Sequence, residues 1–178
     1  REQLRVATID RERLSKRHGA VSVTQYQDDG YLPEALVNYL ARLGWSHGDQ
    51  EVFTMAEMIA LFSADDVNHS ASRFDLDKLR WLNQHYLKTL DPELIRPEFE
   101  WHLAQQGLDL SSGPKAIDLI VALRERVHTL KEMAERARVW FEPLSQYDDA
   151  AVQKHLVAAA KAPLQAAHAA LAGLSEWT

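Results

Sequence analysis

Signals that begin an α-helix recur along this 178-residue chain, and they constrain its fold more than any other feature. Most are Asp or Thr residues, whose side chains can accept hydrogen bonds from the free N–H groups of a first helical turn. The signals are Pro33 at a first helical position, the capping-box pairs Thr54–Glu57 and Thr129–Glu132, and the N-cap residues Asp75, Asp91 and Asp148. Apolar residues follow them at helical spacing. We therefore predict a mainly all-α fold, with a short strand at the β-forming run Val6–Ile9.

This helical pattern makes four more detailed predictions. We expect Pro97 to kink or split its helix, because a proline inside a helix loses a hydrogen bond and clashes with the preceding turn. We expect Pro163 to open a helix that ends near Gly173. Turn-forming residues predict a division between two helical units near residues 107–114. An apolar stripe on the helix that follows is made of Ile117, Ile120, Val121 and Val127.

The composition narrows the class of protein. A content of 46% hydrophobic and 26% charged residues is that of a globular chain. The absence of Cys excludes disulfides and thiolate metal sites and fits the cytoplasm, and no apolar run is long enough for a membrane span. The net charge of −6 is unevenly distributed, because residues 1–18 carry six Lys and Arg against three acidic residues. Contact with a polyanion is therefore expected to be local and oriented.

The basic segment Arg11–Gly19 places four cationic side chains within seven residues. Cations this close repel one another unless an anion lies among them. Lys16 is a compact charge, whereas Arg13 and Arg17 carry planar guanidinium groups that can bind phosphate oxygens in pairs. The segment suits a triphosphate or a nucleic-acid backbone, and the alternative is a solvated basic turn.

Several longer patterns follow this segment in a fixed order. They are Asp-Asp-Gly-Tyr-Leu-Pro-Glu-Ala-Leu-Val-Asn-Tyr-Leu at residues 28–40, Leu-Gly-Trp-Ser at 43–46, Phe-Asp-Leu-Asp-Lys-Leu-Arg-Trp-Leu-Asn at 74–83 and Glu-Trp-Thr at 176–178. With the Leu-Ser-Lys-Arg-His-Gly sequence of the basic segment, they resemble bacterial glutamyl-tRNA synthetase over residues 13–178. The resemblance implies a remnant of the catalytic domain at 1–19, a stem-contact helical domain at 20–90 and the first helical part of an anticodon-binding domain at 91–178.

The resemblance also assigns roles to the basic segment. It matches the signature loop that closes over ATP (with Mg2+) during glutamate activation, with Lys16 as the catalytic residue and Leu14, Ser15, Lys16 and Arg17 at ATP-binding positions. Arg13 stands where the family usually has Lys. The family's glutamate pocket and acceptor-end insertion precede this loop, so we expect the chain to be a fragment without ligase activity or ATP–pyrophosphate exchange of its own.

The remaining residues are expected to hold tRNA(Glu), with the protein as a cytoplasmic monomer. Lys78, Arg80 and Trp81 could hold a phosphate and pack on a ribose. The alternative is that Trp81 belongs partly to the core and the two cations only flank it. Arg124 and Arg126 match a family segment in which the second Arg reads the last anticodon base, whereas without that pattern they would be a solvated helix face.

No metal site is expected, because the eight His residues are scattered without carboxylates at ligand spacing. No Ser-His-Asp set stands out either, because a catalytic triad is defined by geometry rather than by sequence position. Exposed or core His is the expected state of these residues. A different class of function is an all-helical protein-interaction module with an acidic docking surface. The order of the basic segment and the Arg126 segment favours the synthetase fragment, which would bind tRNA with a steep salt dependence.

Overall fold

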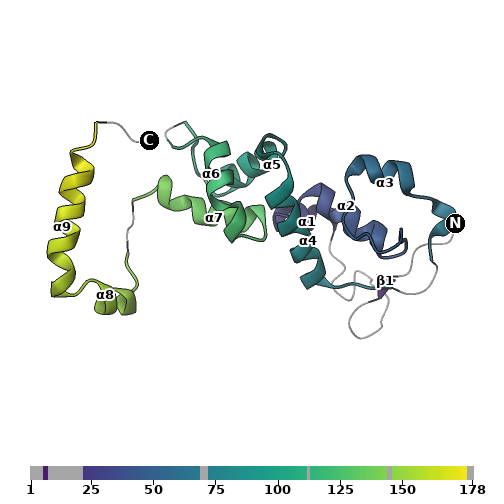
Figure 1. The fold of residues 1–178 in the computed structure, drawn as a ribbon, viewed down its shortest axis with the longest axis horizontal. Helices are drawn as coiled ribbons and strands as arrows, with labels where there is room; N and C mark the ends of the chain where they lie inside the picture. Colours follow the sequence, from purple (N-terminus) through teal and green to yellow (C-terminus); the bar gives the residue numbers. More distant parts are fainter. Residues whose placement is uncertain (1–5, 8–21, 69–71, 112, 144–145, 176–178) are drawn as a thin grey trace. The chain divides into compact units, whose positions relative to one another are not determined.

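The computed structural model describes residues 6–7, 22–68, 72–111, 113–143 and 146–175 (Figure 1). The predicted ATP-binding positions Leu14, Ser15, Lys16 and Arg17 lie outside these residues, as does the Glu-Trp-Thr pattern at 176–178. The chain forms two compact units, residues 1–141 and 142–178. Each unit is described by itself.

Helices make up most of the first unit, which confirms the predicted mainly all-α class. They are α1 (Val23–Asp28), α2 (Pro33–Arg42), α3 (Met55–Leu61), α4 (Leu76–Thr89), α5 (Pro92–Gln105), α6 (Ala116–Leu123) and α7 (Leu130–Ala137), with the 3-10 turns η2 (Ala64–Asp66), η3 (Arg124–Arg126) and η4 (Arg138–Trp140). Strand β1 (Val6–Ala7) falls within the predicted run and pairs in parallel with β2 (Ser72–Arg73), with Val6 opposite Ser72.

The N-terminal caps of these helices follow the sequence signals closely. Thr54 and Glu57 form a complete capping box at α3, and Asp75 accepts from the N–H groups of Asp77 and Lys78 at the start of α4. The second predicted capping box is only half formed. Thr129 accepts from the N–H of Glu132, but the Glu132 carboxylate accepts from the N–H of His128 instead of from the cap residue.

One hydrophobic core runs through the first unit from α2 to α7. Its fully buried side chains include Leu79, Ile95, Phe99, Ile120 and Met133. Helices α5 and α6 pack directly against each other, although the turn between them was predicted to divide two units. That prediction is wrong, because the core is continuous across the turn. A smaller cluster of Trp45, Phe53 and Met58 lies beside α3.

The structure excludes one of the two outcomes predicted for Pro97 and corrects the predicted face of α6. Helix α5 runs unbroken through Pro97, so the proline does not split it. The proline removes one backbone hydrogen bond from the helix. The helix continues because the buried residues Ile95, Phe99 and Leu103 hold it in the core on both sides of the proline. On α6 the buried face consists of Ala116, Leu119, Ile120 and Leu123, whereas the predicted Val121 is exposed.

The second unit contains α8 (Asp149–His155) and α9 (Ala158–Ala172). Asp148 caps α8 as predicted, by accepting from the N–H of Ala151. Pro163 does not open α9, which begins five residues earlier in a run of Ala residues that favour helix. The predicted end of this helix at Gly173 is confirmed. Within the described ranges, no helix is both long and apolar enough to cross a bilayer.

Candidate nucleic-acid interface

Lys78 and Trp81 lie together on α4, one helical turn apart. The Lys78 Nζ atom is 4.5 Å from the centre of the Trp81 ring, which is the geometry of a cation–π contact. Trp81 is 45% exposed, so a large part of its side chain faces solvent. The pair therefore presents a positive charge and an aromatic face to solvent.

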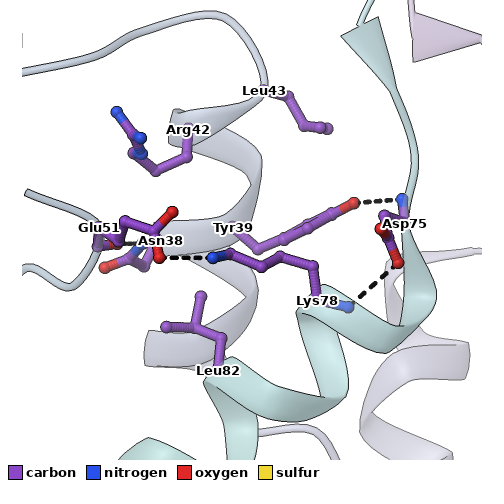
Figure 2. A pocket seen from close by; sticks show the side chains of 8 residues that line it. All are labelled: Asn38, Tyr39, Arg42, Leu43, Glu51, Asp75, Lys78 and Leu82. Atoms are coloured by element: carbon purple, nitrogen blue, oxygen red, sulfur yellow. Dashed lines mark hydrogen bonds and ion pairs between the residues drawn. The ribbon is translucent and has the colours of Figure 1, made fainter. Parts of the chain in front are cut away.

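The charge of Lys78 already has a partner in this structure. Its Nζ atom is 2.5 Å from the Glu51 carboxylate, and both side chains are nearly half exposed (Figure 2). The hydrogen bond and the positive charge of Lys78 lower the pKa of Glu51 below its ordinary value. A phosphate that binds Lys78 must therefore compete with Glu51.

Arg80 is also exposed on α4, but it does not lie beside Lys78. Residues two positions apart on a helix do not face each other, so Arg80 and Lys78 point in different directions. Burial raises the pKa of Tyr31, and the positive charge of Arg80 opposes that increase, which places Arg80 near Tyr31. Of the three residues predicted to cluster on α4, the structure thus joins Lys78 and Trp81, whereas Arg80 does not face Lys78.

A pocket of about 230 Å³ lies between α2 and α4 beside Lys78. Figure 2 shows Lys78 extending across from α4 toward Glu51, while the Tyr39 hydroxyl accepts a hydrogen bond from the N–H of Asp75. Arg42 also lines this pocket, and its buried Nη1 atom has no hydrogen-bond partner among the described groups. No local sequence pattern indicated Arg42 or Glu51. Arg42 comes near Lys78 through the packing of α2 on α4, and the loop that carries Glu51 is held to α2 by a hydrogen bond from Asn38 to the Glu51 carbonyl.

Arg124 and Arg126 lie on η3, the 3-10 turn that follows α6. Arg126 is exposed and Arg124 is half-buried. The turn is held between Leu123 and Val127, which are both buried in the core. The Arg126 guanidinium is therefore on the surface, and the backbone that carries it is part of a packed unit.

One acidic residue lies within this turn and another follows it at the start of α7. The carboxylate of Glu125, between the two arginines, lies 3.3 Å from the Nζ atom of Lys88 on α4. In α7, burial raises the pKa of Glu132, but hydrogen bonds from the His128 N–H and from Arg136 outweigh it, so the pKa is lowered overall. Glu132 is thus ionised at neutral pH and helps to hold the turn that precedes α7.

Histidines and carboxylates do not gather into a metal site in the part of the chain that is described. His102 is buried, and this burial lowers its pKa, which keeps the imidazole neutral. It is therefore a core histidine, one of the two states expected from the sequence.

Comparison with known proteins assigns the chain to a class of protein. The family described as "tRNA synthetases class I (E and Q), catalytic domain" matches residues 2–81, and the "Anticodon binding domain" family matches residues 80–178. The junction between the two matches lies within α4, and η3 falls in the second.

Named relatives narrow the class further. The chain is 60% identical to the glutamate–tRNA ligase of Xanthomonas oryzae pv. oryzae (strain PXO99A) over 93% of its own length and 36% of the relative, and 59% identical to that of Xanthomonas axonopodis pv. citri. A crystal structure of a glutamate tRNA ligase from Elizabethkingia meningosepticum, in complex with its amino acid, matches with a TM-score of 0.77 at 29% identity, over 96% of this chain and 38% of that one. The glutamate–tRNA synthetase of Elizabethkingia anophelis matches with a TM-score of 0.64 at 32% identity, over 81% of this chain and 32% of that one.

The chain thus carries the anticodon-binding domain of a class I tRNA synthetase. Within that class it belongs to the glutamyl-tRNA synthetase family, as the resemblance predicted. It spans about a third of the length of the curated relatives that it matches, 36% in the first of them.

Proposed function

We propose that this chain is the tRNA-binding portion of a glutamate–tRNA ligase. The whole protein would form glutamyl-adenylate from glutamate and ATP and then transfer the glutamyl group to tRNA(Glu). The observation that carries the proposal is the exposed Arg126 on a turn fixed in the core, within the residues that match the anticodon-binding domain.

In this proposal the two cationic regions of the first unit have separate tasks. Arg126 reads the last anticodon base, because a guanidinium can stack on an unpaired base and donate to its edge. Arg124 lies on the same turn and supports this contact by binding phosphate. Lys78 and Trp81 contact the backbone of a tRNA stem, and Arg80 contributes to the same electrostatic attraction.

The basic segment supplies the link to catalysis. Lys16 would stabilise charge that develops on the phosphates of ATP (with Mg2+), and Leu14, Ser15 and Arg17 would lie along the nucleotide. These roles, the cytoplasmic location, the monomeric state and the division into parts at residues 19 and 90 stay predictions.

Binding of tRNA(Glu) to filters over a series of salt concentrations tests the proposal. We expect the logarithm of the binding constant to fall linearly with the logarithm of salt concentration, because phosphate contacts release counterions. Arg126→Gln should reduce the preference for tRNA(Glu) over a transcript with an altered last anticodon base by about 1–3 kcal/mol.

Arg96→Gln is the matched control, because Arg96 is a half-exposed arginine of the same unit that pairs with Glu93 and Glu100 on its own helix. It removes the same charge, so it should leave the preference between the two transcripts unchanged. Binding that is independent of salt would instead support the protein-interaction module.

A further inference from the structure

Asn83 is a fully buried polar residue at the middle of α4, with 0% of its surface exposed. Its Oδ1 atom accepts a hydrogen bond of 2.8 Å from the N–H of Leu32, ahead of α2. Its Nδ2 group donates to the carbonyl of His128, ahead of α7, at 2.6 Å, and more weakly to the carbonyl of Gly30 at 3.5 Å. One amide therefore joins two loops that are about a hundred residues apart in sequence.

Gly30 forms the other half of this contact. Its carbonyl accepts a hydrogen bond of 2.9 Å from the N–H of Leu130, the first residue of α7. Its φ angle is +85°, and a Cβ atom added there would lie 2.4 Å from the backbone nitrogen of Lys131 and 2.8 Å from that of Leu130. The loop therefore presses directly against the first turn of α7, and only glycine allows this approach.

The contact fixes the segment that carries the arginines. The carbonyl held by Asn83 belongs to His128, two residues after Arg126. On its other side η3 packs against α4, where Lys88 pairs with Glu125. The backbone of residues 124–130 is thus held both by α4 and by the loop at Gly30.

We propose that Asn83 and Gly30 are positioning residues for RNA recognition, which hold residues 124–130 so that the side chains of η3 meet an anticodon base in one orientation. The inference rests on the proposed function of this site and adds residues that do not themselves touch RNA. An apolar residue could fill the space of Asn83, but it could not bind the Leu32 N–H and the His128 carbonyl at once.

The test uses the full-length synthetase with Asn83→Asp and Gly30→Ala. Asn83→Asp keeps the size of the side chain and the acceptor for Leu32, but places a second carboxyl oxygen against the carbonyl of His128. Gly30→Ala pushes the first turn of α7 away from the loop. The measured quantity is the ratio of kcat/KM for tRNA(Glu) and for a transcript with an altered last anticodon base.

Both variants are expected to lower this ratio about tenfold, which corresponds to about 1.4 kcal/mol, while kcat/KM for the altered transcript changes much less. The control is Leu79→Val, which removes a methylene group from the core one turn before Asn83 in the same helix and leaves the hydrogen-bonding groups of the contact unchanged. All ratios are measured at a temperature well below the midpoint of thermal unfolding of each variant. If Asn83→Asp does not fold, Asn83→Ser replaces it, since serine supplies a hydroxyl in place of the amide.

Four outcomes are distinguishable when Arg126→Gln is measured alongside. A lower ratio for both Asn83→Asp and Gly30→Ala, with no change in Leu79→Val, supports the positioning role. A lower ratio for Arg126→Gln alone overturns it. A lower ratio for Asn83→Asp and Gly30→Ala but not for Arg126→Gln supports the positioning role, but with a different residue of the segment 124–130 as the one that reads the base. The proposed role of Arg126 then fails. An equal loss in Leu79→Val shows general destabilisation and overturns the proposal.

Discussion

The two surfaces proposed to contact RNA belong to the same unit but are built in opposite ways. On α4, Lys78 extends over Trp81 and toward Glu51, and its charge is already engaged in the free protein. On η3, Arg126 is exposed, and the backbone beneath it is held by buried groups on either side. The surface on α4 thus carries a lysine on a flexible side chain that is already paired with a carboxylate. The surface on η3 carries an exposed guanidinium on a fixed backbone.

This difference suits two different tasks. A lysine on a flexible stem tolerates variation in the position of a phosphate, so it adds affinity with little dependence on sequence. Reading a base requires donors held in one geometry, because a small displacement breaks both hydrogen bonds of a guanidinium. We therefore expect substitutions at η3 and its supports to alter selectivity, and substitutions around Lys78 to alter overall affinity.

The largest expected effect is on stability, and it distinguishes Asn83, which holds the segment beneath Arg126, from Lys78. Asn83→Ala leaves the Leu32 N–H and the His128 carbonyl buried without partners, and should lower the free energy of unfolding by about 2–4 kcal/mol. Lys78→Gln, at a half-exposed ion pair, should change it by no more than about 0.5 kcal/mol. Urea denaturation measures both values. Similar losses for the two variants would contradict the proposed difference in rigidity.

Replacing Arg126 by lysine tests whether geometry or charge matters at η3. Arg126→Lys keeps the charge but loses the planar pair of donors, so we expect discrimination between transcripts that differ in the last anticodon base to fall by about 1–3 kcal/mol. The salt dependence of binding should stay the same, because the number of positive charges is unchanged. Competition binding at several salt concentrations measures both. Retained discrimination would mean that the charge alone is enough.

The parts of this arrangement that were predictable from sequence are local. The caps at Thr54, Asp75 and Asp91 involve residues two or three positions apart, so their spacing identified them correctly. The arginines of η3 and the lysine and tryptophan of α4 could be selected as candidates because the family pattern is continuous there, and their roles in binding stay predictions. Spacing within a helix similarly indicated that Lys78 and Trp81 could meet.

What could not be predicted depends on contacts between distant residues. Glu51 meets Lys78 across 27 positions, and Asn83 meets His128 across 45, so no local pattern records either pair. The buried face of α6 was misjudged for a related reason. Its sequence is apolar on nearly all sides, and the packing of α5 and α7 decides which residues, such as Leu119, are buried.

A smaller effect is expected from Lys78 itself. Lys78→Gln should weaken binding of all tRNA transcripts by a similar factor, about 1 kcal/mol, and should reduce the salt slope by about one. The discrimination ratio should not change. Lys78→Arg is the matched control, since it keeps the charge beside Trp81 and should preserve the slope. A sequence-dependent loss in Lys78→Gln would remove the distinction between the two surfaces.

The smallest effect tests the competition between Glu51 and RNA for Lys78. Glu51→Gln removes the carboxylate partner, so binding should tighten by a few tenths of a kcal/mol, up to about 1 kcal/mol, because exposed ion pairs are worth little. Glu93→Gln is the control, since Glu93 is an exposed carboxylate that pairs with Arg96 on its own helix. The gain should vanish when Glu51→Gln is combined with Lys78→Gln. An equal gain from Glu93→Gln would indicate a general change in net charge.

Stability gives an independent measure of the same ion pair. Lys78 lowers the pKa of Glu51 in the folded chain, so the stabilisation that the pair provides is present above the ordinary pKa of glutamate. It is lost as the pH falls through the lowered pKa. The difference in unfolding free energy between the natural chain and Glu51→Gln should therefore be small at neutral pH, because the groups are exposed, and should approach zero in acid. A difference that instead grows as the pH falls would mean that Glu51 does not form this ion pair with Lys78 in solution.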